Sequence, residues 1–446
     1  LAEKETQLNR LYKYFIPEIL LPKGVNPPTS TALNTYGWQE VKGSVPNLFH
    51  QARVQWPSTN ANALRGPSIR TGFKWRQPQY QKPFLKEMAL LISSNAAASG
   101  ATEVTWCVSY PSAFSPNEAR SYRRLWTDLC NDLSALTGMR QTFKDEGGAA
   151  GLQTEAVAFA SYFGNYLNRQ MVHTACLDVG GGTTDISIWE ENRLVHQVSV
   201  PFAGRNICTN VLQNKPTFIR FLFAPGITGE ISENDAKLRQ DPNFNSWFDN
   251  CLRYESDELL RDRMPIHRAD QERQLIEFVS IMAISFGGIY HYLGLILKAL
   301  AKESLLRKQT PVPVYMGGNG ARFLNWLDES GSFSPGCDAD ELFEILQRKS
   351  AGFESGSTGA ARTTLSGAFK DETSCGLISR GVNLQGDFDP RDDLMIAGEE
   401  LIINKKVFLP LERVDFTGID RVESYALGSL RELKQFVSNY DEALGS

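Results

Sequence analysis

Hydrophobic residues recur three and four positions apart in two stretches of the chain, which is the spacing of one face of a helix. The pattern predicts a helix over Phe84–Ser99, which Gly100 ends. A second helix is predicted because Ser115–Glu118 combines a capping serine, a proline at the first helical position and the glutamate of a capping box. Its apolar stripe runs to Gly138, a residue type that commonly ends helices.

Short apolar runs bounded by turn residues predict buried strands at Val104–Val108 and Val312–Met316. Between them, Thr174–Val200 has the pattern of a strand, a glycine turn and a second strand. The helical stretch Thr154–Leu167 precedes it and is rich in small residues, which permit close backbone approach. Because strands and helices alternate, we predict an α/β fold.

One long apolar stretch raises the question of whether the chain crosses a membrane. Phe278–Leu297 has the length of a membrane span, and His291 is its only side chain that titrates near neutral pH. Two adjacent glycines and two serines dilute its hydrophobicity, and no aromatic belt flanks it. A buried helix inside a large α/β domain has the same pattern, and we predict that structure rather than a membrane span.

The C-terminal part of the chain, from Gly381 onward, predicts strands around Leu394–Ile396 and Leu401–Leu409 and a closing helix from about Gly428. An acidic loop precedes these elements. Its spacing lacks the glycine and the terminal glutamate of a calcium-binding EF-hand, so a solvated turn is predicted. The acidic residues are Asp387, Asp389, Asp392 and Asp393.

Composition narrows the class of protein. The chain has 446 residues, enough for two to four domains of roughly 100–200 residues each. Its net charge of −5 provides no field that would recruit nucleic acid or anionic lipid. Its seven cysteines include no Cys-x-x-Cys pair, which favours neither a disulfide framework nor a zinc site and fits the reducing cytoplasm. The sequence starts at Leu1 without an initiator methionine, so we expect it to be part of a longer protein.

The strongest chemical signal is a run of three glycines within Asp178–Ile188 (DVGGGTTDISI). Consecutive glycines let the backbone turn sharply and present its N–H groups as a concave nest for phosphate oxygens. The Thr183 hydroxyl adds a donor for the terminal phosphate, and Asp178 is placed to hold a hydrated Mg²⁺ or to orient an attacking water. The alternative is a glycine-rich hairpin turn with acidic flanks. The glycines are Gly180, Gly181 and Gly182.

A second glycine motif, Val314–Arg322 (VYMGGNGAR), begins in a predicted strand. A strand that runs into Gly317 and Gly318 at the start of a helix lets an adenine and a ribose approach the backbone with no side chain in the way. This segment therefore predicts the base-binding part of a nucleotide site.

These motifs resemble those of the superfamily that joins actin, the sugar kinases and the seventy-kilodalton heat-shock chaperones. The form DxGGGTTDxS looks like the second phosphate loop of that superfamily and is most similar to the chaperone branch. Val314–Arg322 resembles its adenosine motif, and Lys370–Gly381 resembles its second connecting helix. Further segments that resemble the chaperones, in the same order along the chain, are Val104–Phe114, Asn117–Arg124, Thr154–Gly164 and Val198–Ile207.

The resemblance implies an α/β, two-lobed actin-like ATPase fold of the ribonuclease H-like type, each lobe a mixed sheet flanked by helices with an inserted subdomain. Lobe I would be residues 1–172 with an insertion at about 22–83, and lobe II residues 173–376 with an insertion at about 215–275. Residues 377–446 would return to lobe I and add a C-terminal extension. ATP or ADP, with Mg²⁺, would bind between the lobes.

The resemblance also implies roles for individual residues. Catalytic roles fall to Asp178, Thr183, Glu155 and Lys74, and Asp178 would hold Mg²⁺ through water. Lys74 is similar in position to the chaperone lysine that reaches the γ-phosphate, and an ordinary surface lysine is the alternative. The implied nucleotide contacts are Gly180, Gly181, Gly182, Thr184, Gly204, Gly317, Gly318, Asn319, Arg322 and Asp371.

The chain departs from the chaperone pattern in three places. The first phosphate loop, DxGTTxS, occurs nowhere in the sequence, and we expect it upstream of Leu1, so ATP hydrolysis by this chain is left open. The adenine-contacting pattern ExxKRxxS has its nearest candidate in Glu233–Arg239. No chaperone-type β-sandwich for peptides follows the second connecting helix.

The sequence thus predicts a cytoplasmic, ATP-binding, heat-shock-chaperone-like ATPase module of a larger protein. Nucleotide would drive closure of its lobes, and a protein partner or client would respond to that closure. Two alternatives are an actin-like filament-forming ATPase and a nucleotide-binding pseudoenzyme that serves as an interaction subunit. Neither nucleic acid nor a membrane is an expected partner.

Overall fold

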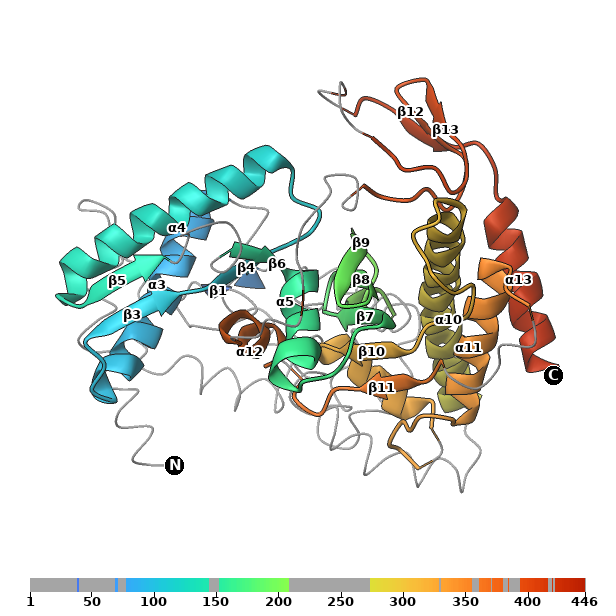
Figure 1. The fold of residues 1–446 in the computed structure, drawn as a ribbon, viewed down its shortest axis with the longest axis horizontal. Helices are drawn as coiled ribbons and strands as arrows, with labels where there is room; N and C mark the ends of the chain where they lie inside the picture. Colours follow the sequence, from blue (N-terminus) through green and yellow to red (C-terminus); the bar gives the residue numbers. More distant parts are fainter. Residues whose placement is uncertain are drawn as a thin grey trace, which may run out of the picture. The chain divides into compact units, whose positions relative to one another are not determined.

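The computed structural model describes residues 38–39, 69–70, 78–143, 152–207, 273–328, 330–354, 361–369, 371–379, 384, 394–415, 419 and 422–445. It is a mixed α/β structure with several separate sheets (Figure 1). The chain divides into two compact units. Unit 1 comprises Leu1–Cys107, Ser115–Gly151 and Leu212–Leu259, and unit 2 comprises Val108–Phe114, Leu152–Val211 and Leu260–Ser446. The division into lobes at residues 172 and 376 stays a prediction.

Unit 1 contains two long helices and a parallel pair of strands. Helix α3 (Pro78–Ala98) contacts helix α4 (Pro116–Thr137), and strand β3 (Glu103–Trp106) pairs in parallel with β5 (Arg140–Phe143). The predicted helix before Gly100 is thereby confirmed. A separate antiparallel pair joins β1 (Trp38–Gln39) and β2 (Ile69–Arg70).

The predicted boundaries of helix α4 are confirmed. The Ser115 hydroxyl accepts the backbone N–H of Glu118 at 3.3 Å, and the backbone N–H of Ser115 donates to the Glu118 carboxylate at 2.8 Å. At the other end, Gly138 has a φ of 68° and closes the helix in the left-handed conformation. The inner face of the helix buries Trp126, whose ring lies 5.4 Å from that of Trp106.

The prediction of one strand at Val104–Val108 is wrong in its extent. Strand β3 ends at Trp106, and after Cys107 a second strand, β4 (Val108–Tyr110), begins. Strand β4 pairs in parallel with β6 (Leu152–Thr154) and belongs to unit 2. The apolar run is continuous, but its two halves pair with different strands, and this choice of partner is not encoded in local hydrophobicity.

The core of unit 2 is a five-stranded mixed sheet with the order β11-β10-β7-β8-β9. Its strands are β7 (His173–Val179), β8 (Thr184–Glu190), β9 (Arg193–Val200), β10 (Val314–Gly317) and β11 (Thr363–Leu365). Strand β8 pairs antiparallel with both β7 and β9, whereas β10 lies parallel to β7 and to β11. The predicted strand–turn–strand is therefore a three-stranded meander, and every residue of β8 is buried.

Two short helices cross closely against one face of this sheet. Helix α5 (Glu155–Ser161) continues into a π-helical turn, η2 (Tyr162–Tyr166), and packs on α12 (Glu372–Ile378). At the crossing, a Cβ on Gly376 would overlap the carbonyl oxygen of Ala158, so only glycine fits there. The close backbone approach predicted for the small residues of this helix is confirmed.

Helix α10 (Arg273–Lys302) contains the long apolar stretch of the sequence. By length and composition, Ile276–Lys302 is able to cross a membrane, a test that the core helix of a soluble protein also passes. In unit 2 the helix packs along α11 (Asp338–Ala351), where the rings of Tyr290 and Phe343 stack at 4.6 Å. Its fully buried side chains are Met282, Phe286, Leu293, Ile296, Leu297 and Leu300.

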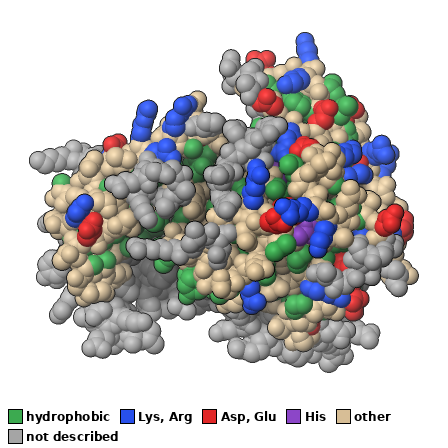
Figure 2. Space-filling model, in the orientation of Figure 1, with side chains coloured by type: hydrophobic (Ala, Val, Ile, Leu, Met, Phe, Trp, Pro, Cys, Tyr) green, Lys and Arg blue, Asp and Glu red, His purple; other side chains and the backbone are tan. Residues whose placement is uncertain are grey.

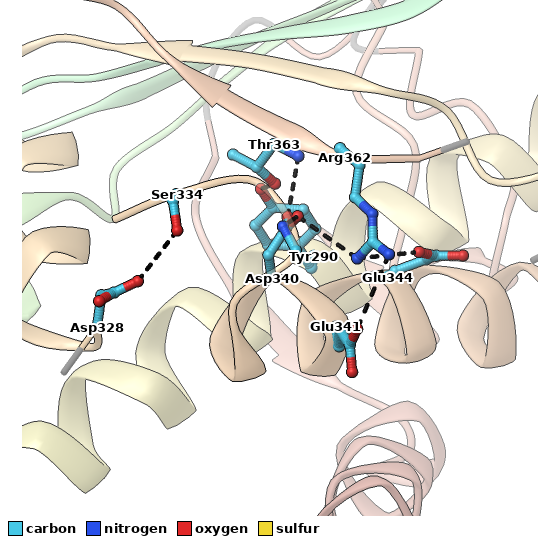
Figure 3. A network of polar contacts seen from close by, with 9 residues as sticks. Tyr290, Asp328, Ser334, Asp340, Glu341, Glu344, Arg362 and Thr363 are labelled. Carbon is cyan, nitrogen blue, oxygen red and sulfur yellow. Dashed lines mark hydrogen bonds and ion pairs between the residues drawn. The ribbon is translucent and has the colours of Figure 1, made fainter. Parts of the chain in front are cut away.

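A network of polar contacts ties α11 to strand β11 (Figure 3). The buried carboxylate of Asp340 accepts the backbone N–H of Thr363 at 2.9 Å and that of Gly336 at 2.7 Å. The Arg362 guanidinium lies 3.8 Å from the carboxylates of Asp340, Glu341 and Glu344. This network holds an edge strand of the sheet against a helix.

A small antiparallel sheet and a final helix complete unit 2. The sheet has the order β13-β12-β14, from Lys406–Phe408, Leu401–Ile403 and Tyr425–Leu427. The strand predicted over Leu401–Leu409 is instead a hairpin, because Asn404 and Lys405 turn the chain with φ of 47° and 71°. Helix α13 (Arg431–Leu444) is the predicted closing helix.

Charged groups of both signs are interspersed over the part of unit 2 seen in Figure 2. Some predicted features lie outside the described residues: Lys74, Glu233–Arg239, the acidic loop at 387–393, and most of the insertions at about 22–83 and 215–275.

Candidate functional site

The predicted glycine turn joins strands β7 and β8 at one end of the unit 2 sheet. The backbone N–H of Gly180 donates to the carbonyl of Thr183 at 2.9 Å, which closes the turn. The next segment of chain folds back on it: Gly204 N–H donates to the Gly180 carbonyl at 3.1 Å, and Arg205 N–H donates to the Gly181 carbonyl at 2.9 Å. These bonds hold the turn in place through its carbonyl oxygens.

Three carboxylates gather beside the turn. Asp178 and Asp185 lie opposite each other in the β7–β8 register, and Glu155 is the first residue of α5. Burial raises the pKa of the Asp185 carboxyl well above its usual range, and the neighbouring charges of Glu155 and Asp178 raise that pKa further. The Ser112 hydroxyl donates to Asp185 at 3.4 Å. Like charges held this close favour a bound cation or a retained proton.

The second glycine motif lies directly against the first. Gly317, the last residue of β10, is paired in register with Asp178. Gly318 has a φ of 78°, and a Cβ there would overlap the Asp178 carboxylate and lie 2.6 Å from the Val179 carbonyl oxygen. A Cβ on Gly320 would lie 2.6 Å from the Gly180 carbonyl oxygen. The space that these glycines leave is filled by the chain itself, so nucleotide contact at Gly317 and Gly318 stays a prediction.

Helix α12 brings two residues to the site that the sequence did not single out. The carboxylate of Glu372, buried to 2% exposure, accepts the backbone N–H of Gly318 at 3.4 Å. The Thr373 hydroxyl donates to the Asp178 carboxylate at 3.4 Å. The predicted residue Asp371 is exposed and precedes the helix. The only sequence signal for this pair was its position next to Asp371.

The remaining predicted residues occupy varied positions around the turn. The buried Thr184 hydroxyl donates to the Phe202 carbonyl at 2.6 Å, so this side chain anchors the turn. Thr183 is half-buried on the turn. The Arg322 guanidinium lies 4.9 Å from the centre of the Phe369 ring. Asn319, also half-buried, begins the 3₁₀ helix η3 (Asn319–Trp326).

One basic side chain near the turn was missed by the sequence analysis. An Nη of Arg205 lies 3.6 Å from the position that a Cβ of Gly182 would take. Gly182 is exposed, so this guanidinium places positive charge beside the open part of the turn. Its sequence signal was weak, because Arg205 follows Gly204 in the segment Val198–Ile207 and the resemblance assigned a role only to the glycine.

The side chains beside the turn supply carboxylate oxygens as possible ligands for a metal ion. Carboxylate oxygens are the ligands that Mg²⁺ prefers, and Mg²⁺ keeps several waters when bound. Among the residues that the structure describes, no group of three or more His, Cys, Asp or Glu side chains has the geometry to hold a metal directly. Mg²⁺ held through water by Asp178 stays a prediction, and Glu155 supplies a second carboxylate beside it.

Comparisons with known proteins do not assign the chain to a family. No protein-family model matches the chain, and no curated protein matches it in sequence. Among solved structures, the chain is similar to the ethanolamine utilization protein EutJ from Carboxydothermus hydrogenoformans, with a TM-score of 0.33 and 14% identity over 84% of this chain and 98% of that one. It is also similar to MreB5 of Spiroplasma citri bound to ADP, with a TM-score of 0.27 and 13% identity over 43% of this chain and 59% of that one. TM-scores of this size do not establish a shared fold.

Proposed function

We propose that this chain binds ATP or ADP, with Mg²⁺, at the glycine turn between β7 and β8, as a nucleotide-binding module of the actin-like ATPase type. One observation carries the proposal: the ends of two adjacent strands bring a triple-glycine turn, a cluster of carboxylates and a second glycine motif to the same place. The motif Asp178–Ile188 supports the heat-shock-chaperone branch of that superfamily.

In this proposal, some groups at the turn bind the phosphates and others hold the metal ion. Backbone N–H groups of Gly181 and Gly182, with the Thr183 hydroxyl and the Arg205 guanidinium, would bind the phosphate oxygens. Asp178 and Glu155 would hold the hydrated Mg²⁺ or orient a water. When bound, Mg²⁺ neutralises the charge of the phosphates.

Thr373 would set the orientation of the Asp178 carboxylate, and Asp185 would set the negative charge around it. The Thr373 hydroxyl donates to one of its oxygens, which fixes the orientation of the carboxylate. Asp185, with its raised pKa, retains a proton more readily than an ordinary aspartate, which limits the negative charge at the site. The site then takes up a divalent cation without three fully ionised carboxylates facing one another.

At the level of the whole chain, we propose a cytoplasmic module that responds to nucleotide by closing its two lobes and so signals to a protein partner. The alternative is a pseudoenzyme that binds nucleotide without hydrolysis. It gains support if the DxGTTxS string, which this sequence does not contain, is missing from the full protein.

Calorimetric titration of the chain with ATP and with ADP, in Mg²⁺, tests the proposal. We expect binding that Asp178→Ala weakens by roughly tenfold or more, since the metal-holding carboxylate is lost. Asp128→Ala, which removes an exposed aspartate of helix α4, is the matched control and should leave affinity unchanged. If the chain binds neither nucleotide at millimolar concentration, the proposal is wrong. Phosphate release measured with the same variants separates an ATPase from a pseudoenzyme.

A further inference from the structure

Helix α13 is fixed to unit 2 along one of its faces and lies outermost of the three helices α10, α11 and α13 (Figure 1). The Phe436 ring lies 5.3 Å from that of His291 on α10, and Asn439 is 4% exposed. At its start, the Glu399 carboxylate accepts the backbone N–H groups of Arg431 at 3.0 Å and Leu433 at 2.8 Å. The helix is therefore capped and has a defined orientation, so its outward face is defined as well.

That outward face carries a row of apolar side chains. Leu433, Val437 and Leu444 are 53%, 51% and 65% exposed, and Leu430 at the N-cap is 49% exposed. Spacings of three, four and seven residues place these side chains in one narrow stripe along the helix. Single exposed apolar residues are ordinary, whereas a continuous stripe is typical of a surface that another helix covers.

The charges beside the stripe indicate what covers it. Lys434 and Asp441 are both exposed and lie seven residues apart on the same flank of the stripe. If a second α13 lies antiparallel across a twofold axis near the middle of the helix, each Lys434 approaches the Asp441 of the other copy. Leu433 then meets Leu444 of the other copy, and Val437 lies near the axis. In a parallel pairing the two copies of this flank would lie on opposite sides of the interface, so Lys434 would not meet an Asp441.

We propose that two copies of this chain associate through an antiparallel pairing of their α13 helices. The pairing is isologous, so it closes on itself as a dimer and does not extend into a filament. It is independent of the proposed nucleotide site. A helix of 14 residues is about 21 Å long, so the interface is small and the dimer is expected to be in rapid exchange with monomer.

Sedimentation equilibrium of the purified chain tests this pairing. We expect a monomer–dimer equilibrium with a dissociation constant in the micromolar range, and Val437→Glu should weaken it by roughly tenfold or more because it buries a charge at the axis. Ile276→Glu, at a residue that is 58% exposed on α10, is the matched control and should leave the equilibrium unchanged. Circular dichroism checks that each variant is folded.

Charge reversal tests the antiparallel arrangement with substitutions that are confined to the surface. Lys434→Glu alone and Asp441→Lys alone should each weaken the dimer by roughly fivefold, because two exposed ion pairs are lost. The double variant should restore it. A chain that stays monomeric up to roughly 100 μM overturns the proposal, since the proposed dissociation constant is micromolar. So does a dimer that Val437→Glu leaves intact, or one that the double reversal fails to restore. A stripe covered by a different protein would also leave the purified chain monomeric.

Discussion

Asp340 and Asp185 are both buried in unit 2, and their surroundings are opposite in kind. Asp340 on α11 accepts two backbone N–H groups and lies beside Arg362, so its charge is balanced by the structure around it (Figure 3). Asp185 on β8 has two further carboxylates and two serine hydroxyls as neighbours, and its pKa is raised.

The difference separates a structural carboxylate from one that fits the proposed nucleotide site. A buried acid that is matched by donors stabilises the fold, and nothing further is needed to satisfy it. A buried acid that faces like charges favours a retained proton or a cation from outside. Both aspartates are buried, so the difference between them lies in the groups that surround each carboxylate.

The largest effect is expected at Asp340. Asp340→Ala leaves two backbone N–H groups and the Arg362 guanidinium without their buried acceptor, so the free energy of unfolding should fall by about 3–5 kcal/mol. Urea denaturation followed by circular dichroism measures this. Glu341→Ala is the matched control, since Glu341 contacts the same guanidinium but its side chain is 59% exposed. A loss at Asp340 below about 1 kcal/mol would contradict the structural role.

The next effect is expected where the two glycine motifs meet. Gly318→Ala should lower the free energy of unfolding by about 2 kcal/mol more than Gly352→Ala. Both glycines have positive φ, of 78° and 73°, but a Cβ on Gly352 meets nothing within 4 Å, whereas one on Gly318 overlaps Asp178. Thermal and urea unfolding of the two variants give the comparison. Equal losses would mean that backbone conformation, and not packing, accounts for Gly318.

A smaller effect is expected at Thr373. Thr373→Val removes one donor to the Asp178 carboxylate while keeping the shape of the side chain, so stability should fall by about 1 kcal/mol. Nucleotide affinity should fall as well, because the carboxylate is less firmly oriented. Thr364→Val on the exposed side of β11 is the control. Calorimetry that shows unchanged affinity would exclude Thr373 from the site.

The subtlest effect concerns the pH dependence of stability. The pKa of Asp185 is raised in the folded chain above its ordinary value of 3.8, so the folded state binds more protons than the unfolded state between these two values. Stability from this group is complete below the ordinary value and is lost as pH rises through the raised one. Asp185→Asn should therefore be more stable relative to the parent chain at pH 7 than at pH 4. An identical difference at both pH values would contradict the raised pKa.

Much of the local structure of the site was predictable. The capping box at Ser115, the left-handed end at Gly138 and the glycine turn after Asp178 follow from which residues can adopt a given backbone conformation or supply a nearby donor. These are interactions between residues a few positions apart, so a single sequence contains all the information they need.

The parts that were missed all depend on distant segments. The apolar run from Val104 to Val108 is divided between two strands, because its first three residues pair with β5 whereas Val108 pairs with β6. Glu372 reaches Gly318, and Thr373 reaches Asp178, only because α12 crosses α5 at Gly376. Such contacts depend on which elements pack together. The hydrophobic pattern predicts that an element is buried, but it does not predict which elements pack against it.

The sequence by itself therefore determined the two ends of helix α4 and the glycine turn after Asp178, because short-range sterics and hydrogen bonding decide both. Only the tertiary structure decided that the turn after Asp178 packs against Gly318, and that Asp185 is surrounded by like charges while Asp340 is surrounded by donors. The reason is physical: the state of a buried charge depends on the groups around it in space, and for Asp185 these come from segments as distant as Ser112 and Glu155.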